Sequence, residues 1–167
     1  GGYFATRIAV HEARIRALIA NSPILDLHAY MASFAGFDPA EMPDAEDFGV
    51  ADLEHIPDQV MPVQTREMSR NLMLRFGRDS FKRTYQRLHD FRVAPAELAR
   101  LRCAALGLVG SGEGREPIAQ YERFLAEVPG ASGHVFTDEE GADGHCQTGN
   151  LALSAAVSMD WLDERFA

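Results

Sequence analysis

The fold is indicated most directly by residues 102–117, which read RCAALGLVGSGEGREP. The apolar run 102–110 ends in a glycine-rich turn, a pattern typical of a strand buried on both faces of a parallel sheet. The turn presents one carboxylate, Glu113, directly after the strand. A helical pattern follows over residues 116–128, and its apolar positions are Ile118, Tyr121, Phe124 and Leu125. This order of strand, turn and helix predicts an α/β fold.

The same alternation continues on both sides of this stretch. A helix is predicted over residues 3–16, with Phe4, Ile8 and Ile15 on its buried stripe and Ala5, Ala9 and Ala13 alongside. Further buried strands are predicted at residues 17–24 and 133–137, and a closing helix at 150–166. We therefore expect a mostly parallel sheet with flanking helices.

Residues 31–98 differ in character, because prolines and acidic residues punctuate them and strand-like runs are absent. Helices are predicted at 65–76 and 80–91. We expect three segments: core at 1–30, a helical insertion or cap at 31–99, and core carrying the acid and histidine loops at 100–167. The apolar side chains of the insertion fit either its own core or a cap over a pocket, and they are Met61, Met68, Met73, Phe76 and Phe81.

Composition excludes several classes of function. The 167 residues carry 16 Lys and Arg against 25 Asp and Glu, a formal net charge of -9, which would repel nucleic acid. No apolar run approaches the roughly 20 residues of a membrane-spanning helix, and no signal peptide pattern is present. Cys103 and Cys146 suggest no disulfide framework, so we expect reduced thiols in a cytoplasmic protein.

Two strand ends carry the chemistry. Glu113 follows one strand, and His145 follows the next strand in a turn before the last helix. Ligands and catalytic groups collect at the carboxyl ends of parallel strands. An acid followed by a histidine matches the end of the Ser, Asp or Glu, His order, in which the carboxylate orients a histidine general base. Glu113 as a solvated carboxylate, His145 beside a helix cap, and Glu116 as the acid are the alternatives, although Glu116 before Pro117 suits helix initiation better.

Other candidate residues are weaker. His134 lies at the far end of a strand from His145 and Cys146, so no metal site is expected, and no cofactor. Cys146 is adjacent to His145 and is a poor candidate nucleophile. Asp26 and His28, just past a strand end, either contact substrate or form a salt-linked structural pair.

Two motifs resemble a known family. Gly1-Gly2-Tyr3, followed by a helix, resembles the end of a nucleophile elbow of the form G-x-S-x-G-G-Y. Residues 140–150, EGADGHCQTGN, resemble the histidine loop of the serine α/β-hydrolases related to prolyl-oligopeptidase-type enzymes. That group includes dihydropseudooxynicotine hydrolases and fungal hydrolases that shorten polyketide pigment precursors. Its acid is commonly Asp in a Gly-x-x-Asp turn, where this sequence has Gly110-Ser111-Gly112-Glu113.

The resemblance implies the C-terminal part of an α/β-hydrolase fold, with the rest of the fold as its partner. Glu113 would orient His145, and His145 would deprotonate a serine two residues before Gly1. Gly1 and Gly2 would lie beside the oxyanion hole. The reaction would be hydrolysis of an ester, or of a carbon–carbon bond next to a ketone, in a small organic substrate. A homodimer is also compatible with it.

Two other functions remain open at this point. A chain that begins at Gly1 lacks the nucleophile, so it could be a non-catalytic binding or structural subunit. The same triad also serves acyltransferases, in which an alcohol or amine replaces water. If the chain is part of a larger fold, its three parallel strands leave a bare sheet edge where the preceding strands would pair, and we expect such an edge to promote association.

Overall fold

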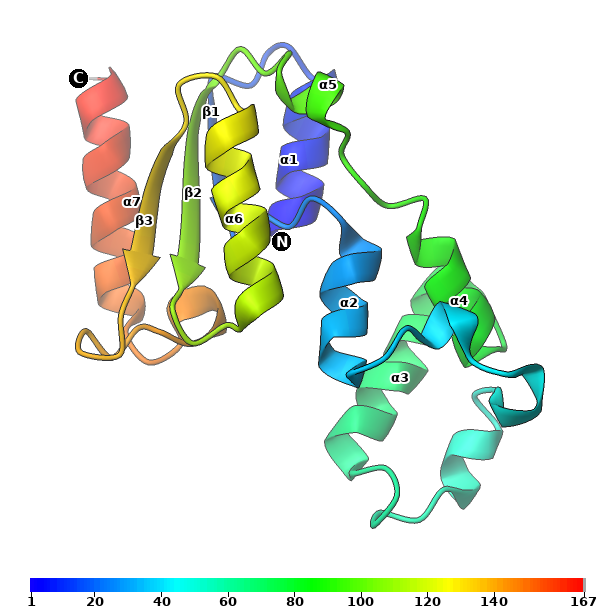
Figure 1. Cartoon of the computed structure of the whole chain (residues 1–167). Coiled ribbons are helices and arrows are strands. Elements are labelled where there is room, and N and C mark those ends of the chain that lie inside the picture. The colour runs from blue at the N-terminus through cyan, green and yellow to red at the C-terminus, as the bar shows by residue number, and fades with distance from the viewer. Residues whose placement is uncertain (167) are drawn as a thin grey trace. The chain divides into compact units, whose positions relative to one another are not determined.

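The computed structural model describes residues 1–166, which form two compact units. The α/β unit comprises Gly1–Asp26 and the chain from Arg92 onward, and the helical unit comprises Leu27–Phe91 (Figure 1). An α/β core interrupted by a helical insertion is therefore the observed organisation. The insertion begins and ends a few residues earlier than the positions predicted from the sequence.

The sheet of the α/β unit is parallel, with the strand order β1-β2-β3. Its strands are β1 (Ala17–Asn21), β2 (Ala104–Gly110) and β3 (Ser132–Phe136). The register places Ala20 opposite Gly107, and Gly107 opposite Gly133. Apart from Ala104, every residue of β2 is buried, because β2 is the central strand. The predicted fold class is confirmed.

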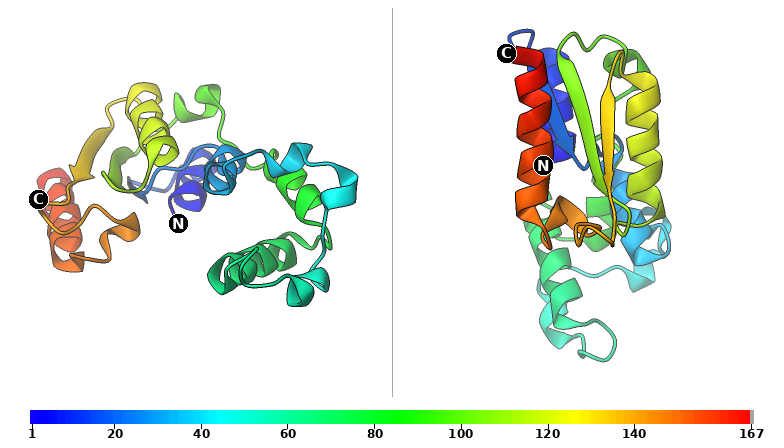
Figure 2. Two further views of the ribbon diagram at one scale, coloured as in Figure 1. Left: turned by 60° about the horizontal axis from the view of Figure 1, so that its bottom comes forward. Right: turned by 90° about the vertical axis from the view of Figure 1, so that its left-hand side faces the viewer.

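Helices cover both faces of this sheet. Tyr121 and Phe124 of α6 (Arg115–Glu127) lie over Gly107, where any side chain would crowd them. On the other face, Trp161 of α7 (Leu151–Phe166) packs against Leu106 and its neighbours. The right-hand view of Figure 2 shows α6 and α7 on opposite sides of the strands.

Helix α1 (Gly2–His11) buries a different face from the predicted one. Phe4 and Ile8 are 57% and 56% exposed, and the buried residues are Gly2, Tyr3, Thr6 and Ala9. The reason is a close approach at the start of the helix: a Cβ at Gly2 would lie 1.7 Å from the carbonyl oxygen of Ser22, so the face that carries Gly2 fits against the end of β1. The helix also ends at His11 instead of residue 16, which leaves Ile15 in the turn before β1.

The helical unit has its own core. Its longer helices are α2 (Leu27–Ala35), α3 (Val63–Phe76) and α4 (Phe81–Leu88), joined by short 3-10 turns that include η1 (Pro39–Glu41) and η3 (Asp52–His55). Met73 and Phe81 are buried in this core, while Met68 is exposed. The sequence pattern does not predict helix α2.

The chain leaves and re-enters the α/β unit at two neighbouring points. The Val93 amide donates to the Leu25 carbonyl at 2.8 Å, and the Leu27 amide donates to the Phe91 carbonyl at 3.0 Å. Asp26 and Arg92 form an antiparallel bridge between these two bonds. Buried Gln120 of α6 fixes the outgoing segment, because its Oε1 accepts from the amides of Leu25 and Asp26. A short helix, α5 (Pro95–Leu98), follows the return.

No helix within residues 1–166 combines the length and apolar character that crossing a membrane requires.

Candidate active site

Glu113 occupies the turn between β2 and α6 and is the centre of a hydrogen-bonded cluster. Its side chain is 1% exposed. The Gly110 amide donates to Oε1 at 2.9 Å, and Ser22 Oγ lies 2.7 Å from both carboxylate oxygens. Nδ1 of His145 lies 2.6 Å from Oε2. The structure therefore brings together the two residues that the sequence singled out.

These contacts decide the charge of Glu113. Burial by itself raises the pKa of this carboxyl, but the hydrogen bonds from His145, Gly110 and Ser22 outweigh burial and leave the pKa below its ordinary value of 4.5. The buried carboxylate is thus negative at neutral pH, and it faces the imidazole of His145.

His145 opens η4 (His145–Gln147), the turn between β3 and α7, and its side chain is 56% exposed. The hydrogen bond to Glu113 raises the pKa of His145 above 6.5, partly opposed by burial. Nδ1 is occupied by Glu113, whereas Nε2 makes no hydrogen bond within residues 1–166. An imidazole held in this way presents Nε2 as a base and is stabilised when it becomes charged.

Glycines hold the histidine turn against the acid turn. A Cβ at Gly110 would lie 2.0 Å from the Asp143 carbonyl oxygen, and the Gly112 amide donates to that oxygen at 3.0 Å. Within η4, Cys146 and Gln147 have φ values of 57° and 51°, a left-handed conformation that residues with side chains seldom adopt. The side chain of buried Gln147 accepts a hydrogen bond from Asn21 Nδ2 at 2.6 Å, which offsets part of the cost of this backbone conformation.

Gly1 and Gly2 lie at the same edge of the sheet as His145. Gly2 contacts the carbonyl of Ser22, whose hydroxyl binds Glu113. The first turn of α1 therefore borders the candidate site.

Other sequence candidates lie elsewhere. Asp26 belongs to the α/β unit, where its carboxylate lies 4.0 Å from Arg92, and His28 belongs to the helical unit, where it contacts Asp38. The Glu116 carboxylate accepts a hydrogen bond from Gln120 Nε2 at 2.8 Å, so Glu113 is the acid that contacts His145.

Two further candidates have simple structural surroundings. Burial and the charge of Glu113 raise the pKa of the Cys146 thiol, which disfavours the nucleophilic thiolate. The His134 ring packs on Phe136 within β3, with centroids 4.5 Å apart. Across residues 1–166, the cluster with metal-ligating spacing includes neither of them.

Sequence reasoning misses Ser22. The segment Asn21-Ser22-Pro23 indicates only the end of a strand, whereas the hydroxyl acts on a residue 91 positions away. The position of Ser22 in the sequence could have indicated its role. Like Glu113 and His145, it follows a parallel strand, and it does so directly.

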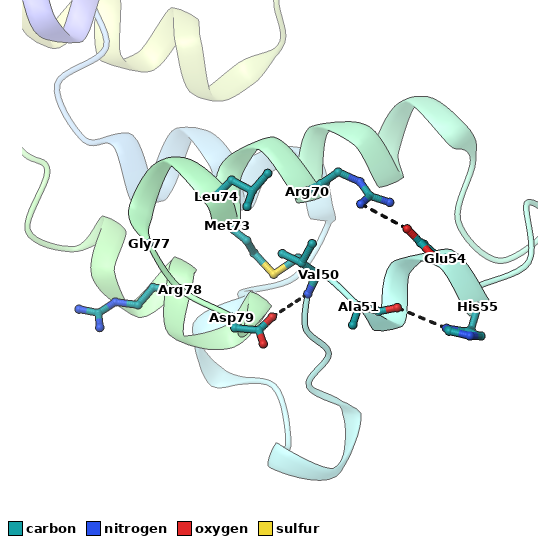
Figure 3. A pocket seen from close by; sticks show the side chains of 10 residues that line it. All are labelled: Val50, Ala51, Glu54, His55, Arg70, Met73, Leu74, Gly77, Arg78 and Asp79. Carbon is teal, nitrogen blue, oxygen red and sulfur yellow. Dashed lines mark hydrogen bonds and ion pairs between the residues drawn. The ribbon is translucent and has the colours of Figure 1, made fainter.

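The helical unit contains a separate surface hollow of about 670 Å³, shown in Figure 3. Met73 and Leu74 of α3 form its apolar part. Three of the charged residues around it have partners: Arg70 lies 3.8 Å from Glu54, and Asp79 accepts from the Val50 amide at 2.9 Å. None of Glu113, His145 and Ser22 lines it.

Comparison with solved structures identifies the architecture. A crystal structure of 2,6-dihydroxy-pseudo-oxynicotine hydrolase superposes with a TM-score of 0.53 and 22% sequence identity, over 97% of this chain. The chain has an α/β-hydrolase-like fold. It spans 36% of the length of that hydrolase. No family model matches the sequence, and no curated protein matches it.

Proposed function

We propose that this chain carries the acid and the general base of a serine hydrolase. Glu113 is the acid, His145 is the base, and the nucleophilic serine lies two residues before Gly1 on a strand-to-helix turn. The observation that carries the proposal is the 2.6 Å contact between His145 Nδ1 and the buried Glu113 carboxylate, with Nε2 left to act. The hydrolase named above, which is similar in fold, supports the class of reaction.

The proposed reaction begins when Nε2 of His145 takes the proton of the serine hydroxyl while its oxygen attacks the substrate carbonyl. Glu113 stabilises the imidazolium that results. The tetrahedral oxyanion accepts hydrogen bonds from backbone amides, one of them on the residue after the serine, beside Gly1. When the intermediate collapses, the imidazolium returns the proton to the leaving group. His145 then takes a proton from water as the water oxygen attacks the acyl group, and it returns that proton to the serine oxygen as the acid product leaves.

The substrate class follows from the same chemistry. With an ester, the leaving group is an alkoxide, which takes the proton from His145 and departs as an alcohol. With a carbon–carbon bond next to a ketone, the leaving group is a stabilised carbanion, which takes the same proton. We propose a small organic substrate of one of these two kinds.

A fluorophosphonate probe tests the proposal in a protein that includes the segment before Gly1. We expect one serine in that segment to be labelled, because the probe reacts with serines activated by a base. His145→Ala should abolish labelling. His55→Ala, which changes an exposed histidine of the helical unit, should leave it intact.

Two results would contradict the proposal. Labelling that survives His145→Ala would show that His145 is not the base. A complete absence of labelling, with the serine turn intact, would favour a non-catalytic module. Product analysis with an added alcohol or amine acceptor separates hydrolysis from acyl transfer.

A further inference from the structure

Three potential metal ligands converge inside the helical unit, from segments far apart in the sequence. His28 lies in the first turn of α2, Asp38 directly precedes η1, and His89 directly follows α4. One ligand atom from each lies within 4.8 Å of the other two. The cluster lies within Leu27–Phe91, apart from the Glu113 and His145 pair, so it is independent of the proposed hydrolase function.

The spacing of the three groups suits a small cation. Nε2 of His28 lies 3.0 Å from Oδ1 of Asp38. Donor atoms about 3.0 to 3.4 Å apart surround an ion that has bonds of about 2.1 Å, so this pair already has the required separation. The rings of His28 and His89 are stacked, with centroids 3.7 Å apart and planes 24° apart. Because the lone pair of a ring nitrogen lies in the plane of the ring, His89 would have to turn out of this stack to bind the same ion.

The surroundings hold the first two ligands in place. His28 is buried, and the edge-to-face contact with Tyr85 has a centroid distance of 6.3 Å. Asp38 Oδ1, the oxygen that lies 3.0 Å from His28 Nε2, also accepts from the Ala40 amide at 2.9 Å, which fixes the carboxylate. Burial, together with the charge of Asp38, raises the pKa of Tyr85 to about 12, so Tyr85 stays protonated and serves in packing.

The alternative is a hydrogen bond between His28 and Asp38 with His89 stacked on it, and no metal. One feature favours a metal: a ring nitrogen of His89 lies within 4.8 Å of the ligand atoms of both His28 and Asp38, a third ligand that a hydrogen bond between His28 and Asp38 does not need.

We propose that His28, Asp38 and His89 form a site for a divalent transition metal ion. Two imidazole nitrogens and one carboxylate oxygen are ligands that suit zinc, with water in the fourth position. Such an ion would join the start of α2, the start of η1 and the end of α4. Binding would therefore stabilise the helical unit.

Titration of the whole chain with cobalt, a spectroscopic substitute for zinc, tests the site. We expect one equivalent to bind, to give visible absorption bands of low coordination number, and to be displaced by zinc. His89→Gln and Asp38→Asn should each weaken binding roughly tenfold or more, a loss that follows even from changing residues that only support a ligand. Asp38→Asn keeps Oδ1 as acceptor for the Ala40 amide, so this variant should retain the fold, which circular dichroism of the metal-free protein verifies.

Two control variants make the outcome decisive. His55→Gln alters another histidine of the helical unit, and His145→Gln alters the candidate catalytic one. Both should bind cobalt as the parent does. Absence of the bands, equal affinity in His89→Gln and the parent, or loss of binding in His145→Gln alone would overturn the proposal.

Discussion

Glu113 shows how a single buried carboxylate keeps its charge. Burial favours the neutral acid, yet three donors converge on the two oxygens: the Gly110 amide, the Ser22 hydroxyl and the His145 ring. Hydrogen bonds to a charged acceptor are about twice as strong as those between neutral groups, which is why they outweigh burial here. The result is a fixed negative charge beneath a half-exposed imidazole.

The pH behaviour of His145 should depend on this charge. The raised pKa of His145 means that its contact with Glu113 contributes stability below pH 6.5, and that the contribution is lost as pH rises through the raised value. Because the pKa of Glu113 is lowered, its contribution is present above 4.5 and is lost as pH falls through the lowered value. The contact between His145 and Glu113 therefore contributes most to stability between pH 4.5 and pH 6.5.

We therefore predict that Glu113→Gln lowers the pKa of His145, because the main cause of the upward shift is removed while burial remains. Titration of the imidazole signals by NMR measures the change. Glu116→Gln is the matched control, since Glu116 bonds to Gln120, and it should leave the His145 titration unchanged. An unaltered His145 titration in Glu113→Gln would refute the contact.

Ser22→Ala should destabilise the α/β unit. It removes a hydroxyl donor from a buried charged acceptor, a loss of about 1.5–3 kcal/mol in the free energy of unfolding. Ser111→Ala, at an exposed position in the acid turn, should change it by less than about 0.5 kcal/mol. Urea denaturation of both variants provides the comparison, and equal stabilities would mean that Ser22 does not support Glu113.

At the scale of elements, the junction between β2 and the histidine turn depends on a close backbone contact. Gly110 has no room for a side chain, because a Cβ there would lie 2.0 Å from the Asp143 carbonyl oxygen. Gly144, the residue after Asp143, has open space around it and an extended backbone with a φ of -76°. Only the first of these two glycines is therefore required by the contact.

We predict that Gly110→Ala destabilises the protein by more than about 2 kcal/mol, because the backbone of the histidine turn must move away. Gly144→Ala is the matched control in the same contact region and should be nearly neutral. Thermal unfolding compares the two, and NMR titration of His145 reports whether Gly110→Ala also weakens the contact with Glu113. Similar melting temperatures for both variants would contradict this account.

Some elements can be predicted from the sequence and others cannot. The apolar run that forms β2 and the stripe of α6 reflect burial that repeats along the chain, so both are located to within two residues. The predicted buried face of α1 is wrong, because Gly2, Thr6 and Ala9 are selected by closeness to β1, which hydrophobicity does not record. Glu113 and His145 are found from their places after strands, whereas the role of Ser22 depends on a contact across the sheet.

At the scale of the whole molecule, β1 has a partner strand on one side only within residues 1–166. Phe4 and Ile8 of α1, which packs on β1, are exposed as well. Unpaired strand edges and exposed apolar side chains favour association. We predict that residues 1–167 associate in a concentration-dependent manner.

Sedimentation velocity measures this association. Replacing both Phe4 and Ile8 by Lys should raise the concentration at which it begins, since charge on this face opposes contact. The same replacement of Val60 and Val63, two exposed residues of the helical unit, is the control and should have little effect. A monomer at every concentration, or an equal response to both double variants, would argue against this surface.

Asp26 and Arg92 pair where the chain leaves and re-enters the α/β unit, so the helical unit is an insertion between two adjacent points. Because the outgoing and returning segments are already hydrogen-bonded to each other, a short reverse turn could replace everything between them without moving β1, β2 or Gln120. Evolution could then lengthen, shorten or exchange residues 27–91 while the acid and histidine turns keep their geometry. The length and sequence of the helical unit would thus be free to change independently of the acid and histidine turns.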